Sequence, residues 1–191
     1  MPVFDHFGLI ARFYDRAIPL RNVENIIQYI GLPIGGRLLD AGGGTGRVAQ
    51  ALRNYAQQVV VSDLSLGMLR QGRAKNGLQF TCAHTEHLPF PDDTFERVIM
   101  VDALHHVCNH QETANEMWRV LKSGGRIVIE EPDIRQFSVK FVALAEKLAL
   151  MRSHFIPVEQ ISKLFDHSNA RIWHQMDGFN IFVIVEKTAS A

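Results

Sequence analysis

Cysteine, net charge and long apolar runs are all scarce in this chain of 191 residues, and each scarcity excludes a class of protein. Two cysteines, Cys82 and Cys108, cannot form a disulfide framework, and they fit reduced thiols in the cytosol. The 20 basic residues balance the 20 acidic ones, whereas a protein that binds duplex DNA needs a net positive field. The apolar stretch near 141–151 is interrupted by Glu146 and Lys147, so we expect no membrane span. The N-terminus has neither a basic nor an apolar signal region, and we expect a cytoplasmic protein.

Short apolar runs alternate with helical patterns through most of the chain, and hydrophobic residues make up 47% of it, as in a globular protein. The expected strands are 37–40, 59–63, 78–82, 97–101 and 126–130. Helices are expected over 47–54, from Ser65 onward, and over 111–121, where Ser123-Gly124-Gly125 stops the last of them. Five such alternations indicate a doubly wound, mainly parallel sheet.

The end of the chain has a different pattern. Residues 172–176 and 179–185 are rich in β-forming side chains, and only Asp177-Gly178 separates them. This dipeptide suits a tight turn that needs positive φ, so we predict an antiparallel hairpin. The predicted fold class is therefore α/β, a doubly wound, mainly parallel sheet of seven strands that finishes in this hairpin. No repeat, low-complexity stretch or linker divides the chain, and we expect one domain over 1–191.

A glycine-rich loop follows the first expected strand, where open α/β sheets bind their ligands. Gly42, Gly44 and Gly46 are spaced G-x-G-x-G, and Arg47 stands where the dinucleotide fingerprint places its third glycine. The loop begins with Asp40, whose carboxylate would repel a pyrophosphate but favour a positively charged ligand. S-Adenosylmethionine carries a sulfonium and an ammonium and no phosphate, so it fits this loop better than a nicotinamide dinucleotide does.

Asp63 ends the second expected strand, 23 residues after Asp40. A carboxylate at this place can accept hydrogen bonds from both hydroxyls of a ribose, which any adenosine ligand presents. A purely structural alternative stays open at this point. In it, the glycines only pack the helix on the strand, and Asp63 only caps the next helix.

Four segments carry these features in one order and spacing: LLDAGGGTGRVAQAL (38–52), VVVSDLSLGML (59–69), TEHLPFPDDTFERVIMVDALHHV (85–107) and RVLKSGGRIVIEEP (119–132). They resemble the class I S-adenosylmethionine-dependent methyltransferases, in their small ubiquinone/menaquinone-biosynthesis-like branch, methyltransferase type 11. The opening FDHFGLIARFYD (4–15) also resembles the amino-terminal segment that folds over the cofactor in this family. The resemblance implies a Rossmann-like fold whose last strand is inserted antiparallel between its neighbours.

The resemblance implies S-adenosylmethionine as the cofactor and S-adenosylhomocysteine as its product. Asp40, Gly42 and Gly44 would contact the methionine part of the cofactor, and Asp63 would bind its ribose. The other implied contacts lie at the adenine ring, at the loop after the fourth strand and in the lid; they are Leu64, Met68, His84, Thr85, Val101 and Tyr14. The family usually has aspartate where His84 stands, and a neutral histidine accepts a hydrogen bond through one ring nitrogen only.

His105 and His106 directly follow the fourth expected strand, at the sheet edge that would face the cofactor. An imidazole near neutrality is a suitable proton acceptor, so His106, with His105 beside it, is the candidate catalytic base. The alternative is that both rings only shape the pocket. Five of the nine histidines lie within 84–110, but their spacing matches no zinc pattern and no orienting carboxylate is evident. No metal is expected.

Residues 133–156 are expected to form an acceptor-side insertion. Apolar residues recur there at three- and four-residue steps, and basic residues outnumber acidic ones. This pattern fits a core or homodimer helix, a lid over an apolar acceptor, or peripheral membrane contact through 137–155. The rest of the expected domain comprises a helical lid, a cofactor-binding core, and a last helix with the hairpin, over 1–33, 34–132 and 157–191.

The function predicted from the sequence is methyl transfer to a small, apolar or aromatic acceptor. A module that binds S-adenosylmethionine without transferring a methyl group is the second hypothesis. A nicotinamide-dependent oxidoreductase is the third, and the glycine spacing and Asp40 disfavour it. A nucleic-acid acceptor is not expected, because the sequence has neither a basic face nor an added recognition domain.

Overall fold

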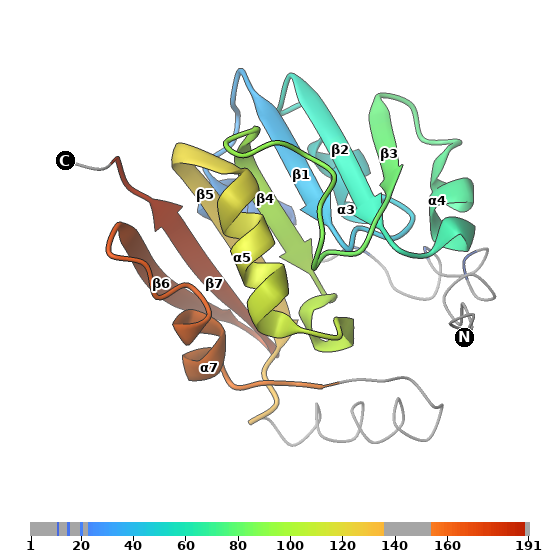
Figure 1. The fold of residues 1–191 in the computed structure, drawn as a ribbon. Coiled ribbons are helices and arrows are strands. Elements are labelled where there is room, and N and C mark those ends of the chain that lie inside the picture. The colour runs from blue at the N-terminus through green and yellow to red at the C-terminus, as the bar shows by residue number, and fades with distance from the viewer. Residues whose placement is uncertain (1–10, 12–14, 16–19, 21–22, 136–153, 190–191) are drawn as a thin grey trace.

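The computed structural model describes residues 11, 15, 20, 23–135 and 154–189. Seven strands form one sheet in the order β3-β2-β1-β4-β5-β7-β6 (Figure 1). The strands are β1 (Arg37–Ala41), β2 (Gln58–Asp63), β3 (Leu78–Cys82), β4 (Phe95–Val101), β5 (Leu121–Pro132), β6 (Ala170–Asp177) and β7 (Asn180–Lys187). The pairs among β1 to β5 are parallel, and β7 lies antiparallel between β5 and β6. The predicted fold class is therefore confirmed.

Helices cover both faces of this sheet (Figure 1). They are α2 (Val23–Ile30), α3 (Arg47–Leu52), α4 (Leu66–Gly72), the 3-10 helix η1 (Leu104–His106), α5 (His110–Val120) and α7 (Val158–Lys163). Buried side chains of α2, α3 and α4 pack on one face, and those of α5 and α7 pack on the other. Central strands covered on both faces need apolar side chains at every position, and residues 181–185 of β7 are all buried.

Two boundaries predicted from the sequence are wrong. Helix α5 ends at Val120, within one residue of the predicted end, but β5 begins at Leu121 and not at Arg126, so Ser123-Gly124-Gly125 lies within the strand. Leu121 pairs with Phe95 before a register shift, which lets the start of β5 join the sheet. At the hairpin, Asp177 pairs with Asn180, so the turn is Gly178-Phe179. Gly178 has a φ of 59° and takes the first turn position, which moves the turn by one residue.

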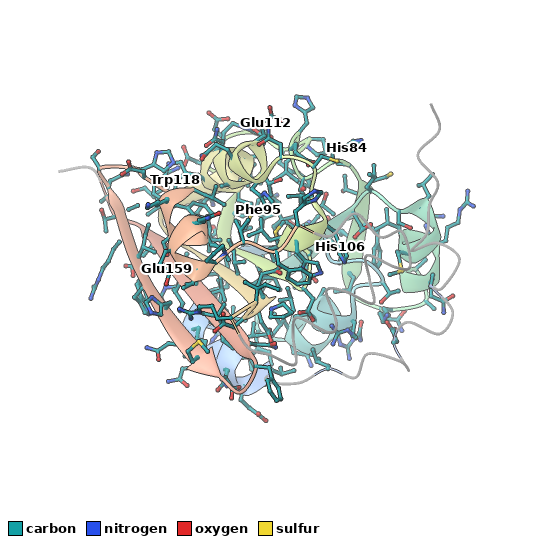
Figure 2. The ribbon with its side chains drawn as sticks, turned by 90° about the horizontal axis from the view of Figure 1, so that it is seen from below. His84, Phe95, His106, Glu112, Trp118 and Glu159 are labelled. Atoms are coloured by element: carbon teal, nitrogen blue, oxygen red, sulfur yellow. The ribbon has the colours of Figure 1, made fainter. Side chains whose placement is uncertain are left out.

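The parallel strands β1, β2, β4 and β5 end at the same edge of the sheet, which is the lower edge in Figure 1. Figure 2 is seen from this side, and His106 is labelled there. Ser65 begins α4 directly after β2, because its side chain accepts a hydrogen bond from the amide of Met68, as predicted for a helix cap. Within the described part of the chain, no helix is long and apolar enough to cross a membrane.

Candidate cofactor and acceptor site

The glycine loop between β1 and α3 has no room for a Cβ at Gly42 or Gly43. Gly42, Gly44 and Gly46 have φ values of 71°, 56° and 71°, which L residues rarely adopt. A Cβ on Gly42 would lie 2.8 Å from the Cβ of Ala103, and one on Gly43 would lie 2.6 Å from the carboxyl carbon of Asp40. The loop is therefore a bare backbone surface at the carboxyl edge of the sheet.

Asp40 is buried beneath this loop, with a relative exposure of 1%. Its Oδ2 has no hydrogen-bond partner among the described residues. Burial raises the pKa of Asp40 to about 7, with a smaller contribution from the nearby Asp63 carboxylate, while the Ala49 amide and the Arg47 guanidinium act to lower it. A buried carboxyl oxygen without a partner is costly unless a ligand satisfies it.

A pocket opens directly over Asp40. Its lining comprises Asp40, the three glycines of 42–44, Arg47, Val48 and Val101. This lining has an unsatisfied acidic oxygen and bare backbone, which fits the ammonium-bearing end of S-adenosylmethionine and would repel a pyrophosphate. The residues present therefore suit the cofactor that the sequence predicts.

Backbone amides orient both carboxylate oxygens of Asp63, the last residue of β2. Its Oδ2 accepts a hydrogen bond from the Gly44 amide at 2.8 Å, and its Oδ1 accepts one from the Ser65 amide at 2.7 Å. An ionised carboxylate can accept about four hydrogen bonds, so these two do not exhaust its capacity. The structure thus places Asp63 against the glycine loop, where the ribose of an adenosine ligand is expected.

The two apolar residues assigned to the adenine ring differ in exposure. Met68 is buried, and its Cε would lie 3.6 Å from a Cβ on Gly44, which places it beside the loop. Leu64 follows Asp63 and has a relative exposure of 48%. An exposed leucine next to a buried methionine can receive an apolar ring face. Their role toward adenine stays a prediction.

His84 and Thr85 follow β3 at the same edge of the sheet. The amide of Ala83 donates to the carbonyl oxygen of Asp63 at 3.1 Å, so the chain leaves β3 beside the end of β2. The His84 side chain, labelled in Figure 2, is 57% exposed. Its Nδ1 lies 3.8 Å from a carboxylate oxygen of Glu86. Thr85 is buried, and its hydroxyl is 3.2 Å from that of Thr113. Only main-chain groups of Thr85 therefore suit a ligand.

Tyr14 lies outside the described residues, but its neighbour Asp15 contacts the glycine loop. The Thr45 hydroxyl donates to Asp15 Oδ1 at 2.5 Å, and Lys75 Nζ donates to Asp15 Oδ2 at 2.5 Å. Lys75 also donates to the Thr45 carbonyl at 2.9 Å. Sequence analysis did not identify Asp15. Its position next to Tyr14, within the segment that resembles a lid, was the available signal.

We expect Asp15→Ala to weaken binding of S-adenosylhomocysteine by about threefold to tenfold, because a partly buried ion pair and a hydrogen bond at the loop are lost. Isothermal titration calorimetry measures the change. Asp92→Ala is the matched control, since Asp92 pairs with Arg119 and its side chain is 73% exposed. Equal effects of the two variants would contradict a role for Asp15 at the loop.

His105 and His106 form the 3-10 helix η1 that follows β4, with Leu104. The expectation that no carboxylate orients these histidines is wrong, because Glu131 Oε2 lies 2.5 Å from Nδ1 of His105. Glu131 Oε1 also accepts hydrogen bonds from the amides of Ala103 and Leu104, at 3.1 and 2.7 Å. Both His105 and Glu131 are buried. The two consecutive acids that end β5 were visible in the sequence, but only the fold shows that Glu131 faces η1.

His106 is less buried than His105 and has a different electrostatic environment. Burial, and then the charge of the neighbouring His105, lower the pKa of His106 to about 3. The His106 ring is therefore neutral at physiological pH. Because its protonated form gives up the proton so readily, His106 is a weak base. This environment favours the alternative in which His106 shapes the pocket. A catalytic role for either histidine stays a prediction.

Among the residues that the structure describes, no group of three or more His, Cys, Asp or Glu side chains could hold a metal ion. The thiols of Cys82 and Cys108 are both exposed and free.

A seven-stranded sheet with its last strand antiparallel, a bare glycine loop and a carboxylate at the end of β2 are features of the class I methyltransferase fold. Residues 39–129 match the family model of the methyltransferase domain. The resemblance to the class I S-adenosylmethionine-dependent methyltransferases that the motifs predicted is therefore confirmed.

Curated relatives share this region. The chain is 35% identical over 136 residues to the demethylmenaquinone methyltransferase of Clavibacter sepedonicus, which covers 65% of this chain and 56% of the relative. It is 35% identical over 115 residues to the ubiquinone/menaquinone biosynthesis C-methyltransferase UbiE of Pseudomonas savastanoi pv. phaseolicola, which covers 55% of this chain and 45% of the relative. The chain thus spans about half the length of the curated relatives it matches.

Solved structures share the fold over the whole chain. One is the methyltransferase partner in a complex with the Trm112 methyltransferase activator of Haloferax volcanii. It superposes with a TM-score of 0.83 and 16% identity, and the match covers 98% of this chain and 100% of that protein. At this identity the likeness shows the fold alone.

Proposed function

We propose that this protein transfers a methyl group from S-adenosylmethionine to a small, apolar or aromatic molecule. The observation that carries the proposal is the pair of carboxylates on the glycine loop: Asp40 buried beneath it with an unsatisfied oxygen, and Asp63 hydrogen-bonded to its amide. One suits the cationic end of the cofactor and the other its ribose. The names of the curated relatives support an acceptor of quinone type.

The cofactor, when bound, supplies a methyl group that is already activated on a sulfonium. Transfer to the acceptor would leave S-adenosylhomocysteine, whose sulfur would keep the electron pair of the broken bond, and the proton that the acceptor loses would pass to water. The chain's own part is to align the reactants and exclude water. Asp40 and Asp63 would hold the cationic end and the ribose of the cofactor, and the Ala103 methyl group beside Gly42 would close the site on the acceptor side.

The proposal is tested by calorimetry with S-adenosylhomocysteine and with NAD. We expect S-adenosylhomocysteine to bind and NAD to show no heat of binding, because Asp40 would face a pyrophosphate. Binding of NAD in place of S-adenosylhomocysteine would instead support the oxidoreductase hypothesis. Transfer of labelled methyl groups to hydroquinones, but not to small polar acceptors, is the expected result for the acceptor class.

A cofactor-binding module without transferase activity is the second candidate. It is favoured by His84, which replaces the usual aspartate and whose side chain is 57% exposed. Binding of S-adenosylhomocysteine with no transfer to any acceptor would support it. The cytoplasmic location, a homodimer and membrane contact through 137–155 also stay predictions, and most of that segment lies outside the described residues.

A further inference from the structure

Three aromatic rings lie together on the acceptor side of the proposed site. The ring of His105 stacks on that of Phe155, with centroids 4.2 Å apart and planes 11° apart. The ring of His106 lies 4.0 Å from that of His105, tilted by 50°. His105 is buried, whereas His106 is partly exposed at the edge seen in Figure 2. His106 and Phe155 are thus the partly exposed rings of the cluster, and His105 is its buried ring.

The buried carboxylate of Glu131 holds this cluster in place. Its Oε2 holds His105 Nδ1, and its Oε1 accepts from two amides at the start of η1. The His154 amide, from the segment that carries Phe155, donates to the carbonyl oxygen of His105 at 2.6 Å. One buried carboxylate thus sets the backbone of η1 and, through His105, the rings that pack on it.

The cluster is close to the cofactor pocket. The His106 amide donates to the carbonyl oxygen of Ala103 at 3.0 Å, and Ala103 abuts Gly42 of the glycine loop. Three residues of 3-10 helix advance by about 6 Å, so His106 lies one turn from the loop. His106 is therefore near the pocket that Asp40 and the glycines line, on the side of Ala103.

We propose that the ring of His106 is a stacking surface for a planar aromatic or hydroquinone acceptor, and that Glu131 is a positioning residue that holds this ring through His105. The inference rests on the proposed methyl transfer and names the acceptor class for it. A neutral imidazole stacks on an aromatic ring without the cost of desolvating a charge, and the lowered pKa of His106 keeps it neutral.

The first experiment separates a stacking surface from a catalytic base. The probe is 1,4-dihydroxynaphthalene, kept reduced under argon, with 1,4-cyclohexanediol as its saturated counterpart. His106→Ala is expected to weaken binding of the aromatic probe roughly threefold to tenfold, and His106→Phe to restore it. Loss of methyl transfer in His106→Phe, with probe binding intact, would show a base and overturn the proposal. Equal affinity of the wild-type protein for both probes would also overturn it.

The second experiment tests the positioning role of Glu131. Glu131→Gln keeps the shape and an acceptor for the two amides, so we expect near-normal stability and only a small rise in the probe's Kd. Glu131→Ala is expected to weaken probe binding by about as much as His106→Ala does, and the double variant to lose no more. Additive losses in the double variant would show that Glu131 does not act through His106.

Binding of S-adenosylhomocysteine distinguishes the two proposals. We expect His106→Ala to bind it as the wild-type protein does, because the ring is assigned to the acceptor alone. If the wild-type protein fails to bind S-adenosylhomocysteine, the proposed function is wrong. If it binds S-adenosylhomocysteine but has the same affinity for both probes, only the proposal of a stacking surface is wrong.

Discussion

Replacing Asp63 by alanine is expected to weaken binding of S-adenosylhomocysteine by about 1–3 kcal/mol, or roughly 5- to 150-fold. The variant removes the carboxylate assigned to the ribose hydroxyls. It also removes the acceptor for the amides of Gly44 and Ser65, which orients the glycine loop against β2. Calorimetric titration gives the affinity, and circular dichroism checks that the variant is folded.

Asp63→Asn is the matched variant. Its amide oxygen can accept one of the two backbone hydrogen bonds, but the side chain has lost its charge. We therefore expect an affinity between those of Asp63→Ala and the wild-type protein. An unchanged affinity in Asp63→Ala would contradict the ribose assignment.

The affinity for S-adenosylhomocysteine is expected to rise about tenfold between about pH 6 and about pH 8, because burial raises the pKa of Asp40 to about 7. Below this pKa the carboxyl of the free protein is protonated and attracts the ligand's ammonium weakly. Above it, the carboxylate is formed before the ligand arrives. Asp40→Asn should bind more weakly and lose this pH dependence.

Glu130 provides the control for this pH dependence. Burial, with the nearby Asp102 carboxylate, also raises its pKa to about 7, but Glu130 does not line the pocket. Glu130→Gln should therefore keep the rise in affinity with pH. If Asp40→Asn kept the rise and Glu130→Gln lost it, Asp40 would not be the group that binds the ammonium.

The raised pKa of Asp40 has the opposite effect on stability: the folded protein becomes less stable as the pH rises. The folded protein holds the Asp40 proton up to about pH 7, whereas the unfolded chain loses it near pH 3.8. Between these values the folded state binds more protons, so the free energy of unfolding falls as the pH rises. Asp40→Asn should therefore raise the melting temperature at about pH 8 and change it little at about pH 4. If Asp40→Asn were less stable than the wild-type protein at both pH values, the carboxyl of Asp40 would not be buried without a partner.

The order of elements and the cofactor side of the site could be predicted because they depend on local signals. Alternating apolar runs and helical patterns indicated the sheet. The G-x-G-x-G loop with Asp40, and Asp63 at the next strand end, lie within 24 residues of one another. Strands that are consecutive and parallel bring their carboxyl ends together, so these residues meet without further information.

The boundaries were less predictable, because long-range pairing decided them. The start of β5 joins the sheet through Phe95, which lies 26 residues before Leu121. Glycines at 124 and 125 favour a helix end in isolation, but the strand continues through them. At the hairpin, the pairing of Asp177 with Asn180 decided which two residues turn.

By itself, the sequence determined the α/β class, the antiparallel hairpin and the loop that suits a cationic nucleoside, since each depends on neighbours along the chain. Only the tertiary structure decided the environment of His105 and His106. Glu131 reaches His105 across 26 residues, and Phe155 reaches it from a segment that follows β5. Burial at that junction makes His106 a weak base, and no spacing in the sequence reveals how deeply a side chain is buried.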